Sequence, residues 1–362
     1  MKMPSCHDNT MPEITNPCSV GIAMSGGVDS TVAAATLLEQ GFSVQGFFMK
    51  LPLPGLEEQI GKVRAVADRL GIPLHFVEMK EEFNKRIIRY FSEEYRRGRT
   101  PNPCVLCNQE IKFGLLMKEM QARGMDRIAT GHYAGICRVK GTTLLRRGHD
   151  PKKDQSYFLC RLSPQQLGQV LFPLAAQCKT DIVLRAQDLG FTRFGGFGEN
   201  ESQDVCFLAK RNLASFLTEQ GVQSKRGDIV TKDGRVLGTH QGIWKYTVGQ
   251  RRGLGIPDAT PWYVIGLDAT RNQVVIGKND ELFCRELILS DMQWQLDVPP
   301  HWQGKVQLRS RHRAASAKVF PAENGYNGYW RVRFQEPQRA VTPGQFAALY
   351  QDDMVVGSGI IT

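Results

Sequence analysis

The sequence predicts an α/β protein with two small β domains at its C-terminal end. Apolar runs of strand length alternate with helix-length segments from Ser19 to about Ile128, the pattern of a doubly wound parallel sheet with helices on both faces. The pattern changes near Arg211. From Gly227 onward, short strand-like runs separated by Gly, Asp and Asn indicate two small β domains, of which the last is expected to be a β-barrel.

Each element of the first part has a local reason. A short apolar run predicts a strand at Val20–Met24, which breaks at Ser25-Gly26-Gly27, and an Ala-rich and Leu-rich helix then extends to Gly41. We expect further strands at Ser43–Met49, Leu74–Val77 and Arg127–Thr130, and helices at Glu57–Leu70 and Glu81–Arg99. Because ligands of parallel sheets bind at the carboxyl ends of the strands, the residues that follow these strands are the first candidates for a site.

The segment after Gly135 is too long for a simple crossover and is expected to form a helical insertion on the sheet. We expect a hairpin of Ile136–Val139 and Leu144–Arg147, then helices at Pro164–Val170 and Asp181–Leu189. The β-type runs of the last part are Asp228–Val230, Lys232–Arg235, Trp262–Leu267, Gln273–Ile276, Lys305–Leu308, Tyr329–Phe334 and Phe346–Tyr350. The predicted domains are a disordered extension at 1–18, a catalytic domain at 19–210, a central β-rich domain at 211–280 and a C-terminal β-barrel domain at 281–362.

Composition narrows the class of protein. The chain has 362 residues, a hydrophobic content of 41% and a net charge of +10, which suits a globular protein with a polyanionic partner. No stretch approaches the length of a membrane span, and the first eighteen residues lack the apolar core of a signal peptide. We therefore expect no membrane partner, a cytoplasmic location and nine cysteines that are mostly reduced.

A glycine turn between the first strand and the first helix predicts a phosphate site. Free N–H groups and the positive end of the helix dipole point at an anion there, and glycines let the backbone approach it. The turn lacks the lysine of a Walker A loop and the glycine spacing of a dinucleotide fingerprint. Instead Ser25 and Ser30 flank Asp29, which is placed to hold Mg²⁺ or to orient the loop. The sequence Ser25-Gly26-Gly27-Val28-Asp29-Ser30 resembles the PP-loop of ATP pyrophosphatases, which implies an adenine nucleotide alpha hydrolase-like fold and ATP as a substrate.

Two cysteines form a Cys-x-x-Cys motif in a proline-punctuated loop. Cys104 and Cys107 follow Pro101 and Pro103, and a helix is expected to begin at Cys107. A cysteine at a helix N-terminus has a depressed pKa and is a better thiolate, so Cys107 is a candidate nucleophile. A zinc site is the main alternative, but the chain offers no second Cys-x-x-Cys or His pair, so no structural metal is expected. A thioredoxin-like dithiol is a further alternative, for which the sheet context is wrong.

A third cysteine, Cys206, follows the polar run from Glu199 to Asp204. A lone cysteine is more often a buried core residue than a nucleophile. The polar residues before Cys206 favour an exposed loop of the kind that carries function.

These motifs together resemble a bacterial tRNA-specific 2-thiouridylase. The resemblance extends from about Ser19 to the C-terminus, and its motifs are listed here in chain order: Met24–Ser30, Asn102–Asn108 with Ile111–Phe113, Thr130–Ala134, Lys153–Tyr157, Asp204–Phe207, Tyr246–Gly255 and Pro343–Gln345. The resemblance implies adenylation of the C2 oxygen of the wobble uridine in Lys, Glu and Gln tRNAs, followed by sulfur transfer from a cysteine persulfide. A cysteine desulfurase or a sulfur-relay protein would donate the sulfur.

The resemblance also implies roles for single residues. Cys206 would carry the persulfide, and Cys107 would attack it as a disulfide forms between the two. The residues implied to bind ATP are Ala23, Met24, Ser25, Gly26, Gly27, Val28, Asp29, Ser30, Met49 and Gly131. Asn102, Pro103 and Cys104 would face the target base. The residues implied to contact tRNA are His132, Lys153, Asp154, Gln155, Arg311, His312 and Gln345. The family often has another residue at position 104, so Cys104 receives no catalytic role.

Two other interpretations fit parts of the sequence. Another PP-loop enzyme, an ATP-dependent ligase or amidotransferase, would need neither Cys107 nor Cys206, nor the basic segment Arg309-Ser310-Arg311-His312-Arg313. A non-catalytic tRNA-binding protein with the same fold would not need intact Ser25, Asp29 and Ser30.

Overall fold

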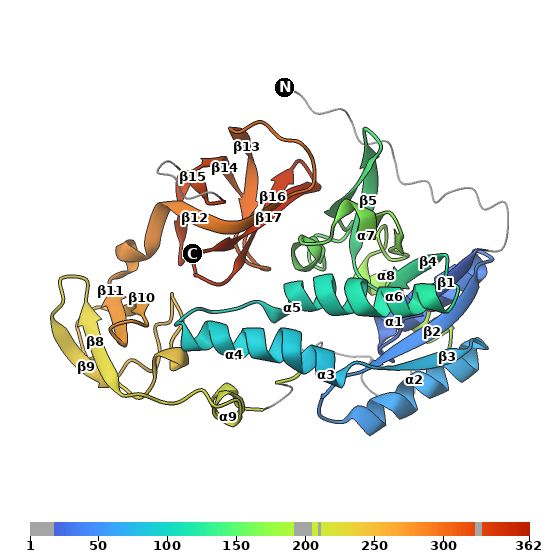
Figure 1. Cartoon of the computed structure of the whole chain (residues 1–362), viewed down its shortest axis with the longest axis horizontal. Helices are drawn as coiled ribbons and strands as arrows, with labels where there is room; N and C mark the ends of the chain where they lie inside the picture. The colour runs from blue at the N-terminus through green and yellow to red at the C-terminus, as the bar shows by residue number, and fades with distance from the viewer. Residues whose placement is uncertain (1–17, 192–204, 209–210, 323–327) are drawn as a thin grey trace. The chain divides into compact units, whose positions relative to one another are not determined.

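The computed structural model describes residues 18–191, 205–208, 211–322 and 328–362. The predicted N-terminal extension, apart from Cys18, and the polar run that ends at Asp204 lie outside the described residues. The chain divides into two compact units. Unit 1 comprises residues 1–86, 104–209 and 353–356, and unit 2 comprises residues 87–103, 210–352 and 357–362. Figure 1 labels most of the helices and strands used below.

Unit 1 is built on a five-stranded parallel sheet with the strand order β3-β2-β1-β4-β7. The strands are β1 (Ser19–Ala23), β2 (Ser43–Lys50), β3 (Leu74–Glu78), β4 (Arg127–Thr130) and β7 (Val170–Leu171). The four predicted strands are confirmed to within one residue at each end. The fifth strand, β7, is a correction, because Val170 was assigned to a helix. Its neighbour in the sheet is β4, so the insertion returns to the sheet edge.

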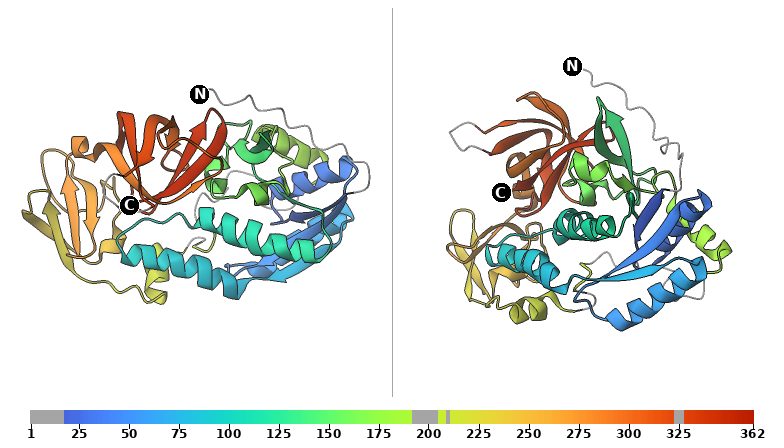
Figure 2. Two further views of the ribbon diagram at one scale, coloured as in Figure 1. Left: turned by 45° about the horizontal axis from the view of Figure 1, so that its top comes forward. Right: turned by 45° about the vertical axis from the view of Figure 1, so that its right-hand side comes forward.

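Helices cover both faces of this sheet, and strand alternation shows which face each covers. Side chains of Val20 and Ile22 share a core with α1 (Val28–Glu39), α2 (Leu56–Leu70) and α8 (Lys179–Asp188). Gly21 points to the opposite face, where a Cβ atom would lie 3.0 Å from Met125 and 3.1 Å from Met120 of α6 (Met117–Ala122). The views in Figure 2 show the blue strands β1–β3 side by side, with α2 along them.

One continuous helical stretch leads to α6 and carries the Cys-x-x-Cys motif. It starts as α5 (Pro103–Leu106), widens into a π-helix, η2 (Cys107–Leu116), and ends as α6. The helix therefore begins at Pro103, four residues before the predicted start. Proline is well suited to the first position of a helix, because its missing N–H has no intrahelical acceptor there.

The insertion of unit 1 contains a hairpin and short helices. The hairpin strands β5 (Ala134–Val139) and β6 (Thr142–Arg147) confirm the prediction, and η3 (Ser156–Leu159) and α7 (Pro164–Leu167) follow. Residues 353–356 also belong to unit 1, where Met354 pairs with Arg146 of β6.

Unit 2 contains a small sheet and a closed barrel. The sheet has the order β10-β11-β8-β9, from β8 (Gly227–Thr231), β9 (Val236–His240), β10 (Tyr263–Asp268) and β11 (Gln273–Gly277). Residues 232–235, predicted as a β-type run, form the turn between β8 and β9 instead. The barrel strands are β12 (Phe283–Trp294), β13 (Trp302–Gln307), β14 (Ala315–Pro321), β15 (Trp330–Arg339), β16 (Phe346–Gln351) and β17 (Met354–Ile361), and pairing of β12 with β17 closes the barrel.

The predicted fold class is confirmed: a parallel α/β sheet is followed by two small β structures, the last a six-stranded barrel. The helix predicted at Glu81–Arg99 is found as α3 (Lys80–Phe83), η1 (Asn84–Ile88) and α4 (Arg89–Arg96). Within the described ranges, no helix is both long enough and apolar enough to cross a membrane.

Candidate functional site

The loop after β1 has the geometry of an anion site. Gly26 has a φ of 76°, and a Cβ there would lie 3.2 Å from the backbone nitrogen of Val63, so only glycine fits without strain. Gly27 is the N-cap residue of α1 and has no side chain to cap the first turn. The first N–H groups of α1 therefore keep their capacity to bind an anion.

Two serines fix the shape of this loop. The Ser30 hydroxyl donates to the Gly27 carbonyl at 3.0 Å and accepts from the Ser25 backbone N–H at 3.2 Å. The Ser25 and Ser30 hydroxyls are 3.2 Å apart. The Met24 N–H donates to the Phe47 carbonyl at 2.8 Å, which joins the start of the loop to β2. These contacts hold the loop in shape before any ligand binds.

Gly131 closes the loop from the side of β4. Its position lies so near α1 that a Cβ would be 2.7 Å from the carbonyl carbon of Asp29 and 2.8 Å from the nitrogen of Ser30. The loop and Gly131, which follow the neighbouring parallel strands β1 and β4, therefore lie together at the carboxyl edge of the sheet. Met49 is the penultimate residue of β2 and is half-buried; its contact with an adenine stays a prediction.

A lysine from α8 approaches this loop, and the sequence analysis missed it. Lys179 Nζ lies 2.8 Å from Asp29 Oδ1, and the Tyr133 hydroxyl donates to the same oxygen at 2.6 Å. Lys179 thus brings to the loop the cation that the loop sequence lacks. A signal existed in the sequence only as a lysine at the start of a helix, which is too common to single out.

Three thiols lie near one another in unit 1. Cys104 and Cys107 stand on successive turns of one helical stretch, and Cys206 lies in the short segment 205–208, which the buried ring of Phe207 anchors against Phe83 of α3 at a centroid distance of 5.9 Å. Cys206 is exposed, so its expected position at the surface is confirmed. A thiolate at Cys206 raises the pKa of both other thiols, so the three lie within electrostatic range of one another.

The expected depression of the Cys107 pKa is wrong. Burial raises the pKa of Cys107 to about 12 and that of Cys104 to about 11. Although Cys206 is exposed at the surface, the protein atoms around its thiol also raise its pKa by desolvation. Desolvation outweighs the helix dipole here, because Cys107 is the fifth residue of the helical stretch and the dipole acts mainly within the first turn. Lys112 lowers the pKa of all three thiols and partly offsets their burial.

His132 connects the nucleotide loop to the thiols. It follows Gly131, and its Nε2 lies 3.3 Å from Lys112 Nζ, while its Nδ1 lies 2.8 Å from Thr130 Oγ1. Desolvation, with a smaller contribution from Lys112, lowers the pKa of His132 well below 6.5, so the ring is neutral. Its predicted contact with tRNA stays a prediction.

The segment predicted to contact tRNA at 153–155 is tightly bonded within unit 1. Asp154 accepts hydrogen bonds from Arg147 at 2.6 Å, from the Gly148 N–H at 3.0 Å and from the Ser156 hydroxyl at 2.9 Å. Gln155 exchanges two hydrogen bonds with the backbone of Tyr133. These contacts give Asp154 and Gln155 a role in shaping the loop, and tRNA contact by Lys153, Asp154 and Gln155 stays a prediction.

Other predicted residues lie in unit 2. Arg309, Arg311 and Arg313 are exposed on one loop, and the Gln307 amide donates to the carbonyls of Arg309 and Ser310 at 3.1 and 3.0 Å. His312 has both ring nitrogens engaged, with the Leu308 N–H at 3.4 Å and with Gln338 at 3.0 Å. His312 therefore holds the loop, and Arg311 is the member of the predicted pair that faces solvent.

Gln345 supports the segment that leads to the predicted base-contacting residues. Its amide donates to the Thr100 carbonyl at 2.8 Å, and the Thr100 N–H donates to Pro343 at 3.0 Å. Asn102 and Pro103 follow Thr100 closely in this unit. The assignment of Asn102, Pro103 and Cys104 to the target base, and of Gln345 to tRNA, stays a prediction.

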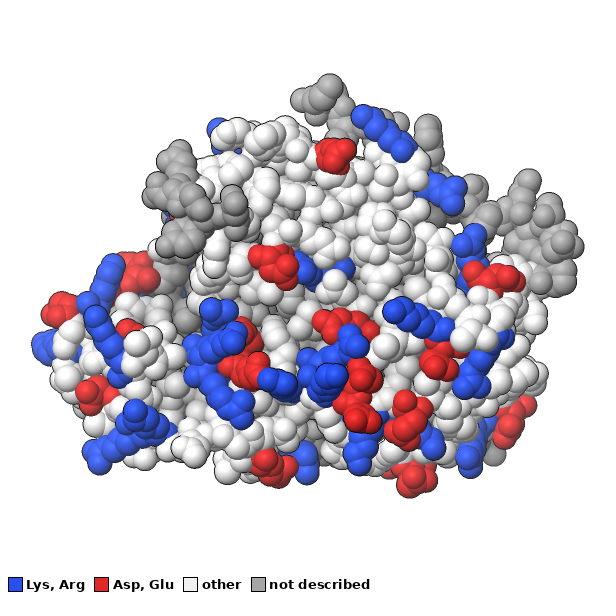
Figure 3. All heavy atoms as spheres, viewed as in Figure 1, with Lys and Arg blue, Asp and Glu red and all other residues white. Residues whose placement is uncertain are grey.

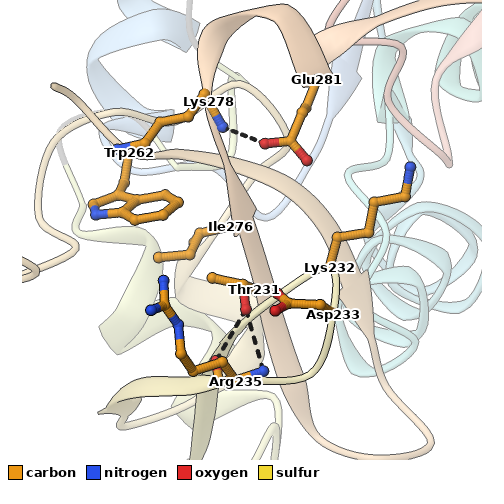
Figure 4. A pocket seen from close by; sticks show the side chains of 8 residues that line it. All are labelled: Thr231, Lys232, Asp233, Arg235, Trp262, Ile276, Lys278 and Glu281. Atoms are coloured by element: carbon orange, nitrogen blue, oxygen red, sulfur yellow. Dashed lines mark hydrogen bonds between the residues drawn. The ribbon is translucent and has the colours of Figure 1, made fainter.

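A cavity of about 540 Å³ lies elsewhere, in unit 2, and none of the predicted site residues lines it. In Figure 4, Trp262 and Ile276 form an apolar wall opposite Lys232, Asp233 and Arg235 of the β8–β9 turn. Lys278 Nζ is bonded to Asp258 at 2.7 Å and lies 3.5 Å from the centroid of the Trp262 ring. The Lys278 cation is thus already neutralised by Asp258.

Charge on the surface is mixed. On the face drawn in Figure 3, Lys and Arg side chains are interspersed with Asp and Glu. On α4, for example, Arg89 pairs with Glu93 at 2.7 Å. Within the described ranges, no group of three or more His, Cys, Asp or Glu side chains is placed to hold a metal ion.

Three family models match successive parts of the chain. Residues 18–210 match the family described as "tRNA methyl transferase HUP domain", residues 214–278 match "tRNA methyl transferase PRC-barrel domain" and residues 284–361 match "Aminomethyltransferase beta-barrel domain". Among solved structures, a 4-thiouridine synthetase–RNA complex with bound ATP aligns at a TM-score of 0.36 and 20% identity, covering 56% of this chain and 50% of that one.

Curated relatives match nearly the whole chain. The tRNA-specific 2-thiouridylase MnmA of Desulfotalea psychrophila is 47% identical over 344 residues, which cover 94% of this chain and 98% of the relative. The protein of the same name from Syntrophotalea carbinolica is 42% identical over 348 residues, covering 94% of this chain and 97% of the relative. At this identity and coverage, the chain belongs to the tRNA-specific 2-thiouridylase family.

Proposed function

We propose that this protein is a tRNA-uridine 2-sulfurtransferase that uses ATP to replace the C2 oxygen of the wobble uridine in Lys, Glu and Gln tRNAs with sulfur. The relatives are named tRNA-specific 2-thiouridylases. The observation that carries the proposal is the continuity from the loop of α1 through Gly131 and His132 to Lys112, which acts on all three thiols. An adenylation site and a sulfur site are thereby joined. The substrate class also implies a cytoplasmic enzyme.

The nucleotide step uses the loop residues 23–30. Backbone N–H groups at the start of α1 bind the phosphates, and Lys179 adds a cation close to them. The uracil O2 attacks the α-phosphorus of ATP, the bond to the β-phosphate breaks and pyrophosphate leaves. The product is an O2-adenylate, whose AMP group departs far more easily than hydroxide.

Mg²⁺ fits Asp29 as a single protein ligand. The carboxylate is 31% exposed, and Mg²⁺ in nucleotide sites is often held by one or two carboxylates together with phosphate oxygens and water. Bound there, the ion would supply charge neutralisation to the departing pyrophosphate. Tyr133 and Lys179 both contact Asp29 Oδ1 and fix the orientation of the carboxylate.

The target base must leave the anticodon loop to reach this site. Extrusion of a base costs a few kcal/mol, and contacts in the pocket must offset that cost. We assign this role to Asn102, Pro103 and Cys104. Arg311 and its neighbours on the 309–313 loop bind the tRNA backbone, where exposed guanidinium groups gain from counterion release.

The sulfur step needs two of the thiols. A donor protein, a cysteine desulfurase or a sulfur-relay protein, leaves a persulfide on Cys206. Its terminal sulfur attacks C2, AMP leaves, and the uracil is held as a mixed disulfide. The Cys107 thiolate then attacks Cys206 Sγ, the old S–S bond breaks, its electron pair stays on the sulfur bound to C2, and a Cys107–Cys206 disulfide forms. If Cys107 attacks first, hydrosulfide is released and adds to C2 instead. Either way an external dithiol must reduce the disulfide before the next turnover.

The runner-up is another PP-loop activity, ATP-dependent ligation or amidation. It shares the adenylation step but gives no role to three adjacent thiols. Methyl transfer, which appears in the family descriptions, gives no role to the Asp29–Lys179 pair beside a phosphate loop.

The test is to incubate the full chain with ATP, Mg²⁺, a persulfide source and unmodified tRNA, and to analyse nucleosides by mass spectrometry. We expect 2-thiouridine and AMP from the wild type. Cys206→Ala should release pyrophosphate but form neither free AMP nor 2-thiouridine, because AMP leaves only when sulfur attacks C2. Cys284→Ala, a control in unit 2, should match the wild type. Thiolation by Cys206→Ala would overturn the persulfide assignment, and AMP without thiolated uridine in the wild type would favour the ligase interpretation.

A further inference from the structure

One positively charged side chain, that of Lys112, stabilises the thiolate form of all three thiols. Lys112 is the charged side chain that opposes the desolvation of Cys104, Cys107 and Cys206 alike. Cys104 and Cys107 belong to its own helical stretch, and Cys206 comes from the separate segment 205–208. The Lys112 side chain therefore stands where two chain segments bring their sulfur atoms together.

The π-helix explains why Lys112 is beside Cys107. The two residues are five apart in η2, and the i→i+5 hydrogen bonds of a π-helix place residue i+5 over residue i. In an α-helix a residue five positions on is rotated by about 140° and faces elsewhere. The wide turn thus puts the ammonium and the thiol on one side of the helix.

Two residues outside the Cys107–Lys112 turn, Gln166 and Gly114, support this register. Gln166 Nε2 donates to the carbonyls of Gln109 and Phe113 at 3.1 and 2.8 Å, and so satisfies acceptors on the wide turns. Its Oε1 accepts from the Ser163 N–H at 2.9 Å, which fixes the amide. Gly114 leaves room for the Gln109 carbonyl, which would lie 3.1 Å from a Cβ.

His132 fixes the position of the Lys112 ammonium and leaves its positive charge in place. The neutral ring donates from Nδ1 to Thr130 Oγ1, so its Nε2 accepts from the Lys112 ammonium at 3.3 Å. The ring packs between Phe113 and Phe172, with centroid distances of 5.9 and 6.3 Å. A neutral acceptor orients the ammonium without cancelling its charge, unlike a carboxylate.

The carboxylates described near this turn have a cationic partner of their own. Arg86 of η1 pairs with Glu82 of α3 at 2.7 Å and with Glu110 of η2 at 3.4 Å. Among the described residues, Lys112 contacts His132 and acts electrostatically on the three thiols.

We propose that Lys112 is a positioning residue of the sulfur-transfer step, the common counter-ion for the sulfur anions that form in turn at Cys206 and Cys107, with neutral His132 holding it in place. The inference rests on the proposed function for its role in turnover. The reaction places negative charge first on the persulfide and then on the attacking thiolate. One fixed cation between the two segments favours both anions without moving.

The test measures thiol reactivity without tRNA or ATP. The rate of alkylation by iodoacetamide is followed for each cysteine by mass spectrometry between pH 6 and 10, in full-length Lys112→Met, Lys112→Arg and Lys118→Met. Lys118 is exposed on α6 of the same helical stretch, so it is a matched control for the loss of one charge. The rate at Cys284, in unit 2, is an internal reference.

Below its pKa, a thiol loses tenfold in thiolate fraction for each unit by which its pKa rises. We expect Lys112→Met to slow alkylation of Cys107 and Cys206 by about tenfold at pH 8. Lys112→Arg should restore most of that rate, and Lys118→Met should match the wild type. Thermal unfolding, monitored by circular dichroism, identifies a variant that fails to fold. If Lys112→Met fails to fold, the alkylation rates of Lys112→Arg are compared with those of the wild type and Lys118→Met instead. Equal rates at both thiols in Lys112→Met and Lys118→Met would overturn the proposal.

A second arm separates this inference from the proposed function. In single-turnover reactions with tRNA, Lys112→Met should release pyrophosphate at the wild-type rate, and should form AMP and 2-thiouridine about tenfold more slowly. A wild type that forms no 2-thiouridine refutes the proposed function, whatever the alkylation rates are. A wild type that thiolates, beside a Lys112→Met variant that thiolates equally fast, refutes the role of Lys112 alone.

Discussion

Replacing Gly131 with alanine tests the contact between β4 and the loop before α1. The added methyl group can be accommodated only if the backbone of these two segments moves apart. A Cβ at position 131 would lie 2.7 Å from the Asp29 carbonyl carbon, and ordinary contact begins at 3.4 Å, so β4 and the start of α1 must separate by about 0.7 Å. The atoms it meets are backbone, which cannot rotate away as the end of a side chain can. Overpacking of this kind costs about 1–3 kcal/mol of stability.

We expect a larger effect on adenylation than on folding. The separation displaces Asp29 and Ser30, which belong to the proposed phosphate site. A misplacement of about 1 Å can cost about 100-fold in rate, so Gly131→Ala should slow AMP formation by roughly 10- to 100-fold. The melting temperature should fall by roughly 2–12 °C, since each kcal/mol of that cost shifts a large domain by roughly 2–4 °C.

A matched glycine provides the control. Gly61 lies on the exposed side of α2, and a Cβ there would meet no atom within 4 Å. Gly61→Ala should keep full activity and gain about 0.5–1 kcal/mol, because alanine favours the helix. Pyrophosphate release measured for both variants, with thermal unfolding in parallel, decides the matter. If Gly131→Ala releases pyrophosphate as fast as Gly61→Ala, then β4 and the loop are not in the contact described.

Three further predictions concern other parts of the site. Lys179→Met should reduce AMP formation at least tenfold while Lys179→Arg keeps most of it, measured at saturating ATP, and an unchanged rate would remove Lys179 from the phosphate site. Gln166→Leu should lose about 1–3 kcal/mol in urea unfolding, because it leaves the Gln109 and Phe113 carbonyls without their amide donor; no loss would mean that water replaces it. Arg311→Ala should weaken tRNA binding and lower the slope of log K against log salt by about one, whereas Arg271→Ala, in the β10–β11 turn, should not; equal slopes would contradict the assignment of Arg311.

The nucleotide loop was predictable because its signal is local. Ser25-Gly26-Gly27 must turn sharply between a strand and a helix, and Gly26 indeed has a positive φ. The parallel strands were equally predictable from short apolar runs. Gly131 could be placed beside the loop because both follow strands of one parallel sheet.

What the sequence could not provide depends on long-range contacts. Lys179 is 150 residues from Asp29 and reaches it only because α8 packs against the same face of the sheet as α1. The raised pKa of Cys107 reflects burial by other elements, which a helix-dipole argument cannot see. The two-residue strand β7 is too short to show a period.

Some misses had a signal in the sequence. Proline at position 103 could have been taken as the first residue of a helix rather than as part of an extended loop. Strand β17 contains Gly357 and Gly359, which weaken its pattern, yet a Cβ on Gly357 would lie 2.8 Å from the Trp294 ring. Glycines in that strand mark close packing of a neighbour rather than a break.

Because this helix is wide, the number of residues between Cys107 and Lys112 decides whether the ammonium lies near the thiol. A π-turn holds one residue more than an α-turn, so the same five-residue spacing gives contact in one form and separation in the other. If this segment relaxed to an α-helix, Lys112 would swing away from the sulfur atoms although no residue had changed. Deleting one residue inside the turn would let an α-helix form and bring the ammonium back. The number of residues per turn of this helix thus determines which of its side chains lie on the same face as the thiols.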